Sequence, residues 1–392
     1  MKANLPRSIS AATSPFAAFT FNIRFPYIIN QIKANNPLSA DQQAALDDLQ
    51  LEITEGVVPP REDIFYPTDQ VYWATFLAKQ AGKRYTELPF FEAEAYIYYR
   101  ITHIVNYKHS GLDVFYRVKA DSLMHHRDFA EAMARKHLQQ RSIFSAGYFT
   151  TLLHAALWGN SADLSQLENN DALVNPALRN HLIIDDSAPL YDLIASTRGR
   201  EVDFVADNAG LELLSDLFLI DYLLTTGQVS LINLHLKAYP TFVSDATISD
   251  VVGHLEILRS FQSEPLAKFI DRVEGHLHGG RLQLLDHPFW NSPCHFTRLP
   301  QVIKQAFNRN TVLIFKGDAN YRRLFEDREW PHTTPVGHLL DYLNRPCFSI
   351  RTLKSEIALG LGDHQLRCLF EADREWLING KYGLIMGNPT YF

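Results

Sequence analysis

The sequence contains few cysteines and no long apolar run. Its three cysteines, Cys294, Cys347 and Cys368, are far apart and lack the spacing of a metal site, which fits a reducing compartment rather than a disulfide-rich secreted scaffold. No run of 18 apolar residues is present, so we expect no transmembrane helix. The N-terminal segment also lacks the continuous apolar core of a secretory signal. These absences predict a cytoplasmic protein without a membrane partner.

Positively charged residues are not in excess either. The chain has 37 Lys and Arg against 44 Asp and Glu, so no surplus of positive charge exists to neutralise phosphates, and we expect no nucleic-acid partner. A GxGxxG loop, an internal repeat and a recognisable Ser/His/Asp or Cys/His arrangement are absent as well. The 392 residues, of which 46% are apolar and 21% charged, suit a globular protein of one large or two modest domains.

The apolar pattern changes character along the chain. Up to about residue 180, apolar residues recur at the three- and four-residue spacing of helices. Beyond that point, short runs rich in Val, Ile, Leu and Phe alternate with helical patterns, which predicts a largely parallel sheet. We therefore predict an α/β fold, with a helical N-terminal domain (1–185) packed on a three-layer α/β/α domain (186–392). The expected strands lie within 200–208, 229–239, 280–290, 310–318, 346–352 and 381–388.

The first strand-to-helix junction places an acid and an amide side by side. Ligands of open α/β sheets bind beyond the carboxyl ends of the strands, which is where Asp207 and Asn208 stand. Both can address one point only if the chain leaves the strand there, as Gly210 would permit. Their oxygens suit Mg²⁺ or Mn²⁺, with Glu212 in the first turn of the next helix and Asp216 one turn later on the same face. Alternatively, Asn208 caps that helix and Glu212 complements its dipole.

The next two junctions also carry polar groups. Asp245 follows the second strand at a helix start, where it is either a cap or a further oxygen ligand near Asp207. A later strand leads Lys316 and Gly317 directly into a helix. Lysine, a glycine turn and a helix N-terminus together form an anion site, unless Asp318 only caps a surface turn.

Two other groups stand at element ends. Arg351 and Lys354 follow the strand at 346–352, where two cations suit either a second anionic group of a substrate or a solvated helix start. Asn160 lies in a polar corner at the end of an N-terminal helix, where the other interpretation is a helix stop with Asp163 capping the next segment.

Taken in order, these segments resemble the signature segments of the DUF89 damage-control phosphatases. The RTLK stretch at 351–354 is like the RTxK motif that marks the third subfamily. The resemblance runs over nearly the whole chain and keeps the motif order, so the set is more specific than any single motif. It is carried by FNIRFP (21–26), EAEAYIYYR (92–100), LWGNSADLS (157–165), DNAGLELLSDL (207–217), FVSDATISD (242–250), FKGDANYRRL (315–324) and SIRTLKSE (349–356).

The resemblance implies a metal site and a substrate site. The family binds one divalent metal (Mn²⁺, Ni²⁺, Co²⁺ or Mg²⁺) through an Asp-Asn pair and a later Asp, which match Asp207, Asn208 and Asp245. These three residues and Asp318 would be the catalytic set. The substrate-binding positions implied by the family are Arg24, Asn160, Glu212, Lys316, Gly317, Asp318, Ala319, Asn320, Arg351 and Lys354.

The activity implied is metal-dependent hydrolysis of small phosphate esters, such as fructose 1-phosphate and related sugar phosphates. Metal and lysine would neutralise the phosphoryl oxygens, because phosphoryl transfer needs mainly positioning and charge stabilisation. Either Asp318 or Glu212 could orient an attacking water. The other mechanism is an aspartyl-phosphate intermediate formed by one of the acids. The alternative is an S-adenosylmethionine-dependent protein-glutamate carboxyl methyltransferase, an activity also assigned within this subfamily, although the sequence has no glycine-rich loop of a methyltransferase Rossmann site.

Overall fold

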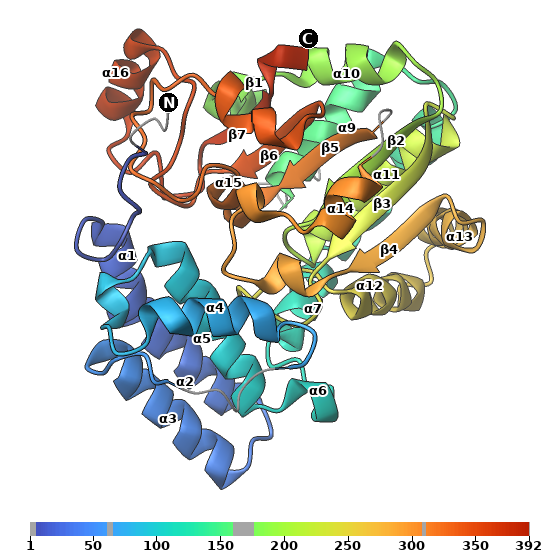
Figure 1. Ribbon diagram of the computed structural model, residues 1–392. Coiled ribbons are helices and arrows are strands. Elements are labelled where there is room, and N and C mark those ends of the chain that lie inside the picture. Colours follow the sequence, from blue (N-terminus) through green and yellow to red (C-terminus); the bar gives the residue numbers. More distant parts are fainter. Residues whose placement is uncertain (1–4, 61–65, 160–175, 308–310, 392) are drawn as a thin grey trace.

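The computed structural model describes residues 5–60, 66–159, 176–307 and 311–391. Within these residues, the C-terminal half is built around a seven-stranded sheet (Figure 1). Its strands are β1 (Leu182–Asp185), β2 (Arg200–Val205), β3 (Val229–Leu236), β4 (Leu282–Asp286), β5 (Thr311–Lys316), β6 (Cys347–Thr352) and β7 (Gly383–Gly387).

The sheet has the order β1-β7-β6-β5-β2-β3-β4 and is largely parallel. Strands β4, β3, β2, β5 and β6 run parallel to one another, whereas β7 is antiparallel to β6 and parallel to β1. The predicted α/β class and the largely parallel sheet are therefore confirmed. The carboxyl ends of β2, β3 and β5 lie at one edge of the sheet, because these three strands are parallel neighbours.

All six apolar runs that predict strands contain strands, but β1 was not predicted. It has only four residues, it is an edge strand, and its burial is partial, so it lacks the apolar run expected of a buried strand. The reversed direction of β7 was also not predicted. Every residue of β7 is buried, and burial on both faces does not encode strand direction.

Helices surround the sheet and form the N-terminal part (Figure 1). Among the described residues, no helix is both long and apolar enough to cross a membrane. A π-helical turn (Thr20–Arg24) joins the first two helices. The α-helices are α1 (Pro15–Phe19), α2 (Phe25–Asn35), α3 (Ala40–Thr54), α4 (Gln70–Gln80), α5 (Phe90–Ile104), α6 (Tyr107–Ser110), α7 (Tyr116–Met124), α8 (Arg127–Gln140), α9 (Ala146–Trp158), α10 (Ser187–Ala195), α11 (Leu211–Thr225), α12 (Ile248–Ser260), α13 (Glu264–His278), α14 (Gln301–Ala306), α15 (Gly317–Leu324) and α16 (Asp363–Ala372).

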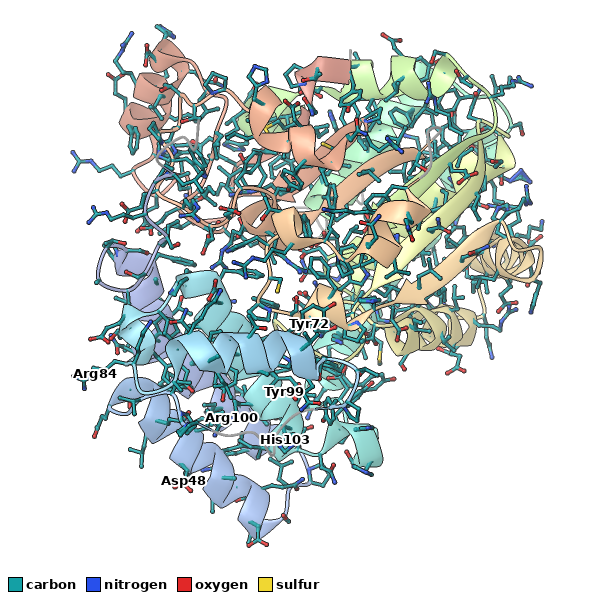
Figure 2. The ribbon with its side chains drawn as sticks, viewed as in Figure 1. Asp48, Tyr72, Arg84, Tyr99, Arg100 and His103 are labelled. Carbon is teal, nitrogen blue, oxygen red and sulfur yellow. The ribbon has the colours of Figure 1, made fainter. Side chains whose placement is uncertain are left out.

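The helices of the N-terminal part are held together by buried contacts between aromatic and charged side chains. Tyr99 of α5 stacks on Trp73 of α4 with ring centroids 4.4 Å apart, and Arg100 forms an ion pair with Glu52 of α3 at 2.8 Å. Figure 2 shows Tyr99 and Arg100 within this helical part. These contacts place α5 at the centre of the N-terminal helices.

The two faces of the sheet belong to two different hydrophobic cores. On β5, Val312 and Ile314 belong to the core formed with helices α8 to α13, whereas Leu313 and Phe315 belong to the core shared with α2, α4 and α5. The period of two along the strand separates the cores. Helix α9 precedes residue 185, yet it packs on α11, β6 and β7. The predicted division at 185/186 stays a prediction.

A buried carboxylate joins three helices on the α8–α13 side of the sheet. Asp221 of α11 accepts hydrogen bonds from His137 Nε2 of α8 at 2.6 Å, His276 Nε2 of α13 at 3.0 Å and Arg272 Nη2 of α13 at 2.7 Å. Burial raises the pKa of Asp221, but these three donors outweigh burial and lower the pKa below its ordinary value. The negative charge of Asp221 therefore stabilises the native packing of these helices.

Replacing Asp221 with asparagine is expected to destabilise the protein by about 3–5 kcal/mol, because the half-buried guanidinium and the two buried imidazole groups lose their common anion. Urea unfolding measures this. The control is Asp271→Asn on α13, whose side chain is 66% exposed and pairs with Arg259 at 3.3 Å. Its free energy of unfolding should change by less than about 0.5 kcal/mol. Equal effects of the two substitutions would contradict the assignment.

Candidate active site at the carboxyl ends of β2, β3 and β5

Two polar segments pair with each other where β2 and β3 end. The backbone N–H of Ala246 donates to Asp207 O at 2.7 Å, and the N–H of Ala209 donates to Ser244 O at 2.7 Å. These bonds form an isolated antiparallel bridge between Asn208 and Asp245. Strand β2 ends before this bridge, so the chain leaves the strand where the sequence predicts. The bridge fixes the spacing of the two segments through the backbone.

The side chains of these segments form one buried cluster. Asn208 Nδ2 donates to Asp207 Oδ2 at 2.7 Å and to Glu212 Oε2 at 2.9 Å. On its other side, Asn208 Oδ1 accepts from Ser244 Oγ at 2.5 Å. The amide therefore joins two carboxylates that would otherwise repel each other.

The backbone between β5 and α15 lies against the cluster. Gly317 begins α15 with φ +81°, and a Cβ atom added there would lie 1.9 Å from both Cγ and Oδ2 of Asp207. Such a distance is impossible, so only glycine lets the backbone pass this close to the carboxylate. The predicted convergence of these strand ends is visible in this contact.

Lys316 lies behind the cluster and is fully engaged by protein oxygens. Its Nζ lies 2.8 Å from Glu212 Oε1, 2.9 Å from Asp216 Oδ1 and 2.8 Å from Ala156 O. Burial lowers the pKa of Lys316, but Asp216 and Glu212 outweigh burial and raise it above its ordinary value. The prediction that Glu212 and Asp216 share one face of α11 is confirmed. A direct contact of Lys316 with a phosphate stays a prediction.

The cluster carries more negative than positive charge. Asp207 forms no ion pair within the part of the chain that the structure describes, and Lys316 serves both Glu212 and Asp216. Burial raises the pKa of Asp207 well above its ordinary value, and the nearby Glu212 and Asp245 raise it further. Burial also raises the pKa of Asp245 to about 6 and that of Asp216 to about 7. Asp216 shares Lys316 with Glu212, and Asp245 pairs with Lys237, so Asp207 is the carboxylate of this cluster without an ion pair among the described residues.

Asp245 is held by a lysine and by an unusual loop. Lys237 Nζ lies 3.2 Å from Asp245 Oδ2, and burial lowers the pKa of Lys237. The loop contains Phe242 and Val243 with φ of 48° and 69°, a left-handed conformation that is strained for a β-branched residue. The Phe242 ring packs against Tyr98 of α5 at a centroid distance of 5.1 Å, and so holds the loop from the helical part.

The RTxK-like segment reaches the cluster through Asp318. Asp318 Oδ1 accepts from Lys354 N at 3.1 Å and from Ser355 Oγ at 3.1 Å, and it lies 3.0 Å from Arg351 Nη2. The fully buried Arg351 guanidinium also lies over the Tyr321 ring at 4.0 Å. The positive charge of Lys354 opposes the rise in the pKa of Asp207 that burial causes.

The remaining predicted substrate residues have different positions. Arg24 is exposed at the end of the π-helical turn. Burial raises the pKa of Tyr98, and Asp245 raises it further, whereas the positive charge of Arg24 lowers it. Asn320 is buried, and its Nδ2 donates to Ala206 O at 3.1 Å, so it joins α15 to the residue that follows β2. Ala319 lies in the first turn of α15 and is half-buried, whereas Asn160 and Asp163 lie outside the described residues.

The donors at this edge fit a hard divalent cation. Two carboxylates and one amide oxygen are ligand types that Mg²⁺ and Mn²⁺ accept, and the uncompensated negative charge favours a cation. No group of three or more His, Cys, Asp or Glu side chains arranged to hold a metal occurs in the ranges that the structure describes. Asp207, Asn208 and Asp245 include only two such side chains, because the third donor is an amide.

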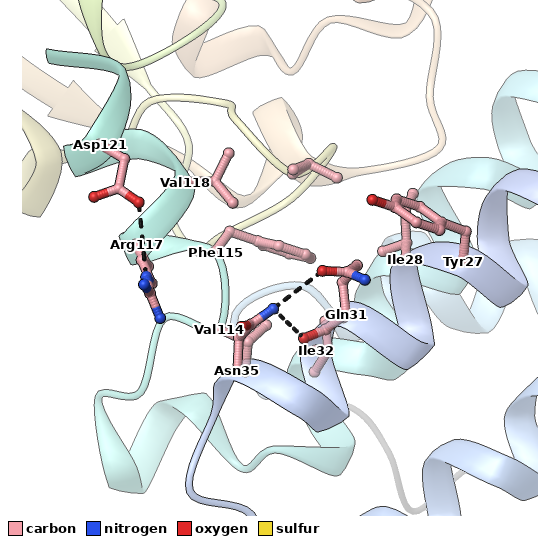
Figure 3. Close-up of a pocket in the computed structure, with 11 residues that line it drawn as sticks. Tyr27, Ile28, Gln31, Ile32, Asn35, Val114, Phe115, Arg117, Val118 and Asp121 are labelled. Atoms are coloured by element: carbon pink, nitrogen blue, oxygen red, sulfur yellow. Dashed lines mark hydrogen bonds and ion pairs between the residues drawn. The ribbon is translucent and has the colours of Figure 1, made fainter. Parts of the chain in front are cut away.

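A cavity of about 380 Å³ lies between α2 and α7, next to the loop that precedes Asp245 (Figure 3). Tyr27 of α2, Val118 of α7 and Phe115 give it largely apolar walls, and Val243 closes one side. Among its described lining residues, none of the three predicted metal ligands appears. The cavity is therefore distinct from the carboxylate cluster, although the two share a loop.

His254 is a residue of this region that the sequence did not indicate. It lies on α12, and its Nε2 accepts a hydrogen bond from the backbone N–H of Gly210 at 2.6 Å. A single histidine within a helix carries no motif, so only the fold reveals this contact. Lys237 follows the last residue of β3, and its pairing with Asp245 also required the structure.

Comparisons with known proteins agree with the fold and with the order of the motifs. A family model described as damage-control phosphatase ARMT1-like domain matches residues 20–367. Proteins named damage-control phosphatase ARMT1 are similar to this chain: that of Bos taurus is 30% identical over 88% of this chain and 87% of its own length, and that of Rattus norvegicus is 31% identical over 76% and 73%.

More distant relatives cover the chain almost completely. The Homo sapiens protein named damage-control phosphatase ARMT1 is 28% identical over 97% of this chain and 98% of its own. A solved structure of a DUF89 family protein from Pyrococcus horikoshii has the same fold, with a TM-score of 0.51 and 15% identity over 95% of this chain and 97% of the other. The chain therefore belongs to the damage-control phosphatase ARMT1-like family of DUF89 proteins and is a phosphatase.

Proposed function

We propose that the chain is a metal-dependent phosphatase for small sugar phosphates such as fructose 1-phosphate, within the RTxK subfamily. The observation that carries this proposal is the buried cluster of Asp207, Asn208 and Asp245 at the converging ends of β2 and β3. Asp207 is 7% exposed and Asp245 is 2% exposed. Burial raises the pKa of Asp207, and the nearby Glu212 and Asp245 raise it further. Burial also raises the pKa of Asp245, although Lys237 opposes this rise. Such a cluster suits a cation.

A bound divalent cation would supply positive charge to the phosphoryl oxygens of the substrate. Asp207 and Asp245 would hold that cation through carboxylate oxygens, and Asn208 through its amide oxygen. Lys316 keeps Glu212 and Asp216 in place behind the ligands. Among the described residues no side chain caps the N-terminus of α15 at Lys316, which leaves its backbone N–H groups and its dipole to favour an anion.

The contacts favour Asp318 over Glu212 as the residue that orients an attacking water. Both oxygens of Glu212 are engaged, Oε1 by Lys316 and Oε2 by Asn208. Among the described residues, only Oδ1 of Asp318 accepts hydrogen bonds, and the side chain is 15% exposed. Asp318 therefore keeps an oxygen to accept a proton or a hydrogen bond from water.

The test is phosphate release from fructose 1-phosphate and p-nitrophenyl phosphate by protein freed of metal with a chelator. Release should be close to zero after chelation and should return when Mn²⁺, Ni²⁺, Co²⁺ or Mg²⁺ is added back, since the carboxylate cluster needs a counter-charge. Full activity in the presence of the chelator would contradict the metal dependence. Activity on p-nitrophenyl phosphate without activity on any sugar phosphate would contradict the substrate class.

A further inference from the structure

Helix α12 carries a buried histidine that contacts the turn after Asn208. His254 is 2% exposed, and its Nε2 accepts from the backbone N–H of Gly210 at 2.6 Å. Gly210 follows Asn208 by two residues and is the N-cap residue of α11, which carries Glu212 in its first turn. The hydrogen bond therefore acts on the short segment that joins the amide of the cluster to one of its carboxylates.

The turn at Gly210 leaves few alternatives for its backbone N–H. Its φ of 69° and ψ of -141° belong to glycine alone, and a Cβ atom there would lie 2.6 Å from Ser122 Oγ of α7. Helix α7 therefore closes one side of the turn, and the imidazole of His254 faces the N–H. A buried N–H without an acceptor destabilises the fold by the full desolvation penalty of the group. The acceptor therefore helps to determine the conformation of the turn.

The same helix also holds the segment of Asp245. Asp250, one turn before His254 on α12, accepts from the backbone N–H and the hydroxyl of Thr247, both at 2.8 Å. It also pairs with Lys119 of α7 at 2.8 Å. One face of α12 thus holds the residues after Asp245 through Asp250, and the residues after Asn208 through His254.

The protonation state of His254 follows from its contacts. A ring nitrogen that accepts an N–H carries no proton, so the proton of the neutral ring is on Nδ1. Burial lowers the pKa of His254 to about 4, and Lys119 lowers it further, whereas Asp250 opposes this effect. The ring is therefore a neutral acceptor at neutral pH.

We propose that His254 is a positioning residue of the phosphatase: its Nε2 fixes the Gly210 turn and thereby the directions of Asn208 and Glu212. This proposal rests on the function proposed above for the cluster. Among the residues that the structure describes, no hydrogen bond or ion pair joins His254 to the predicted metal ligands, so its effect on them passes through Gly210.

Three substitutions separate the acceptor from the bulk of the ring. His254→Gln can place its amide oxygen where Nε2 lies and so keep an acceptor for Gly210. His254→Asn is too short to reach the same point, and His254→Leu fills space without an acceptor. We expect His254→Asn and His254→Leu to lower kcat at least about tenfold with KM nearly unchanged, and His254→Gln to stay within about threefold of the wild type.

Two measurements do not depend on catalysis. Hydrogen exchange, read by mass spectrometry on a peptide spanning Gly210, should accelerate in His254→Asn and His254→Leu and stay slow in His254→Gln. The rise in melting temperature on adding Mn²⁺ should shrink in the first two variants and persist in the third. A variant that is merely destabilised would unfold at a lower temperature but keep the wild-type kcat per folded molecule and the full Mn²⁺ shift.

The outcomes divide clearly. Rescue of exchange protection and kcat by His254→Gln alone supports the positioning role. Wild-type kcat and exchange in His254→Leu overturn it. If the wild-type protein releases no phosphate under any metal condition, the proposed function fails, and hydrogen exchange at Gly210 still decides whether His254 fixes the turn.

Discussion

Replacing Asp207 with asparagine should lower kcat about a thousandfold, which corresponds to about 4 kcal/mol of transition-state stabilisation. The substitution keeps the shape of the side chain and an acceptor for Asn208 Nδ2, but it removes the negative charge that we assign to cation binding. The metal-free variant should nevertheless melt at a higher temperature than the metal-free wild type, because a buried carboxylate without an ion pair is gone. Thermal melts with and without Mn²⁺ measure this.

Asp203 provides the matched control for Asp207. It lies four residues earlier on β2, is 1% exposed, and accepts from His235 Nε2 at 2.6 Å, so it is an equally buried acid with a different partner. Asp203→Asn should change stability and leave kcat within about threefold of the wild type. If Asp207→Asn retained metal-dependent activity at the level of Asp203→Asn, the ligand assignment would be wrong.

Replacing Gly317 with alanine should reduce kcat at least about a hundredfold and destabilise the fold by more than about 2 kcal/mol. The new Cβ would lie 1.9 Å from Asp207 Oδ2, so the carboxylate or the start of α15 must move. Either movement increases the distance between Asp207 and the backbone that joins β5 to α15. Urea unfolding and phosphate release on the same preparation measure the two losses.

Gly82 separates backbone strain from the collision. It has the same φ of +81°, and no atom lies within 4 Å of its added Cβ. Gly82→Ala should therefore cost only about 1 kcal/mol and leave activity unchanged. The double variant Gly317→Ala/Asp207→Gly removes the atoms that collide. Its loss of stability should therefore shrink to that of Gly82→Ala, whereas its activity should stay low. Recovery of neither would show that the collision does not explain the loss.

Much of the fold could be predicted because most of its strands are buried and contain short apolar runs. Every residue of β5 and β7 is buried and most of these residues are apolar, and such runs are recognisable in a sequence. Strand β1 could not be predicted, because a four-residue edge strand that ends in an acid has no such run. The packing of α9 on the sheet was equally hidden, since an apolar helix does not reveal which surface it covers.

The sequence predicted where the candidate site lies, but not which contacts its residues make. The rule that ligands bind beyond the carboxyl ends of parallel strands brought Asp207, Asp245 and Lys316 to one edge, and the structure places them there. The partners of these groups depend on distances between elements that are remote in sequence. The contacts of Lys316 with Asp216, and of His254 with Gly210, therefore needed the fold.

The left-handed loop before Asp245 couples sequence changes in the C-terminal half of the chain to those in the N-terminal helices. Phe242 keeps its conformation against Phe91 and Tyr98 of α5, with ring centroids 5.7 Å and 5.1 Å apart. A change of side-chain volume on that helix would alter the direction of an acid in a loop far along the sequence. Helix α5 and the loop at 242–245 must therefore diverge together during evolution, and grafting the sheet onto another helical partner would require a new support for Phe242.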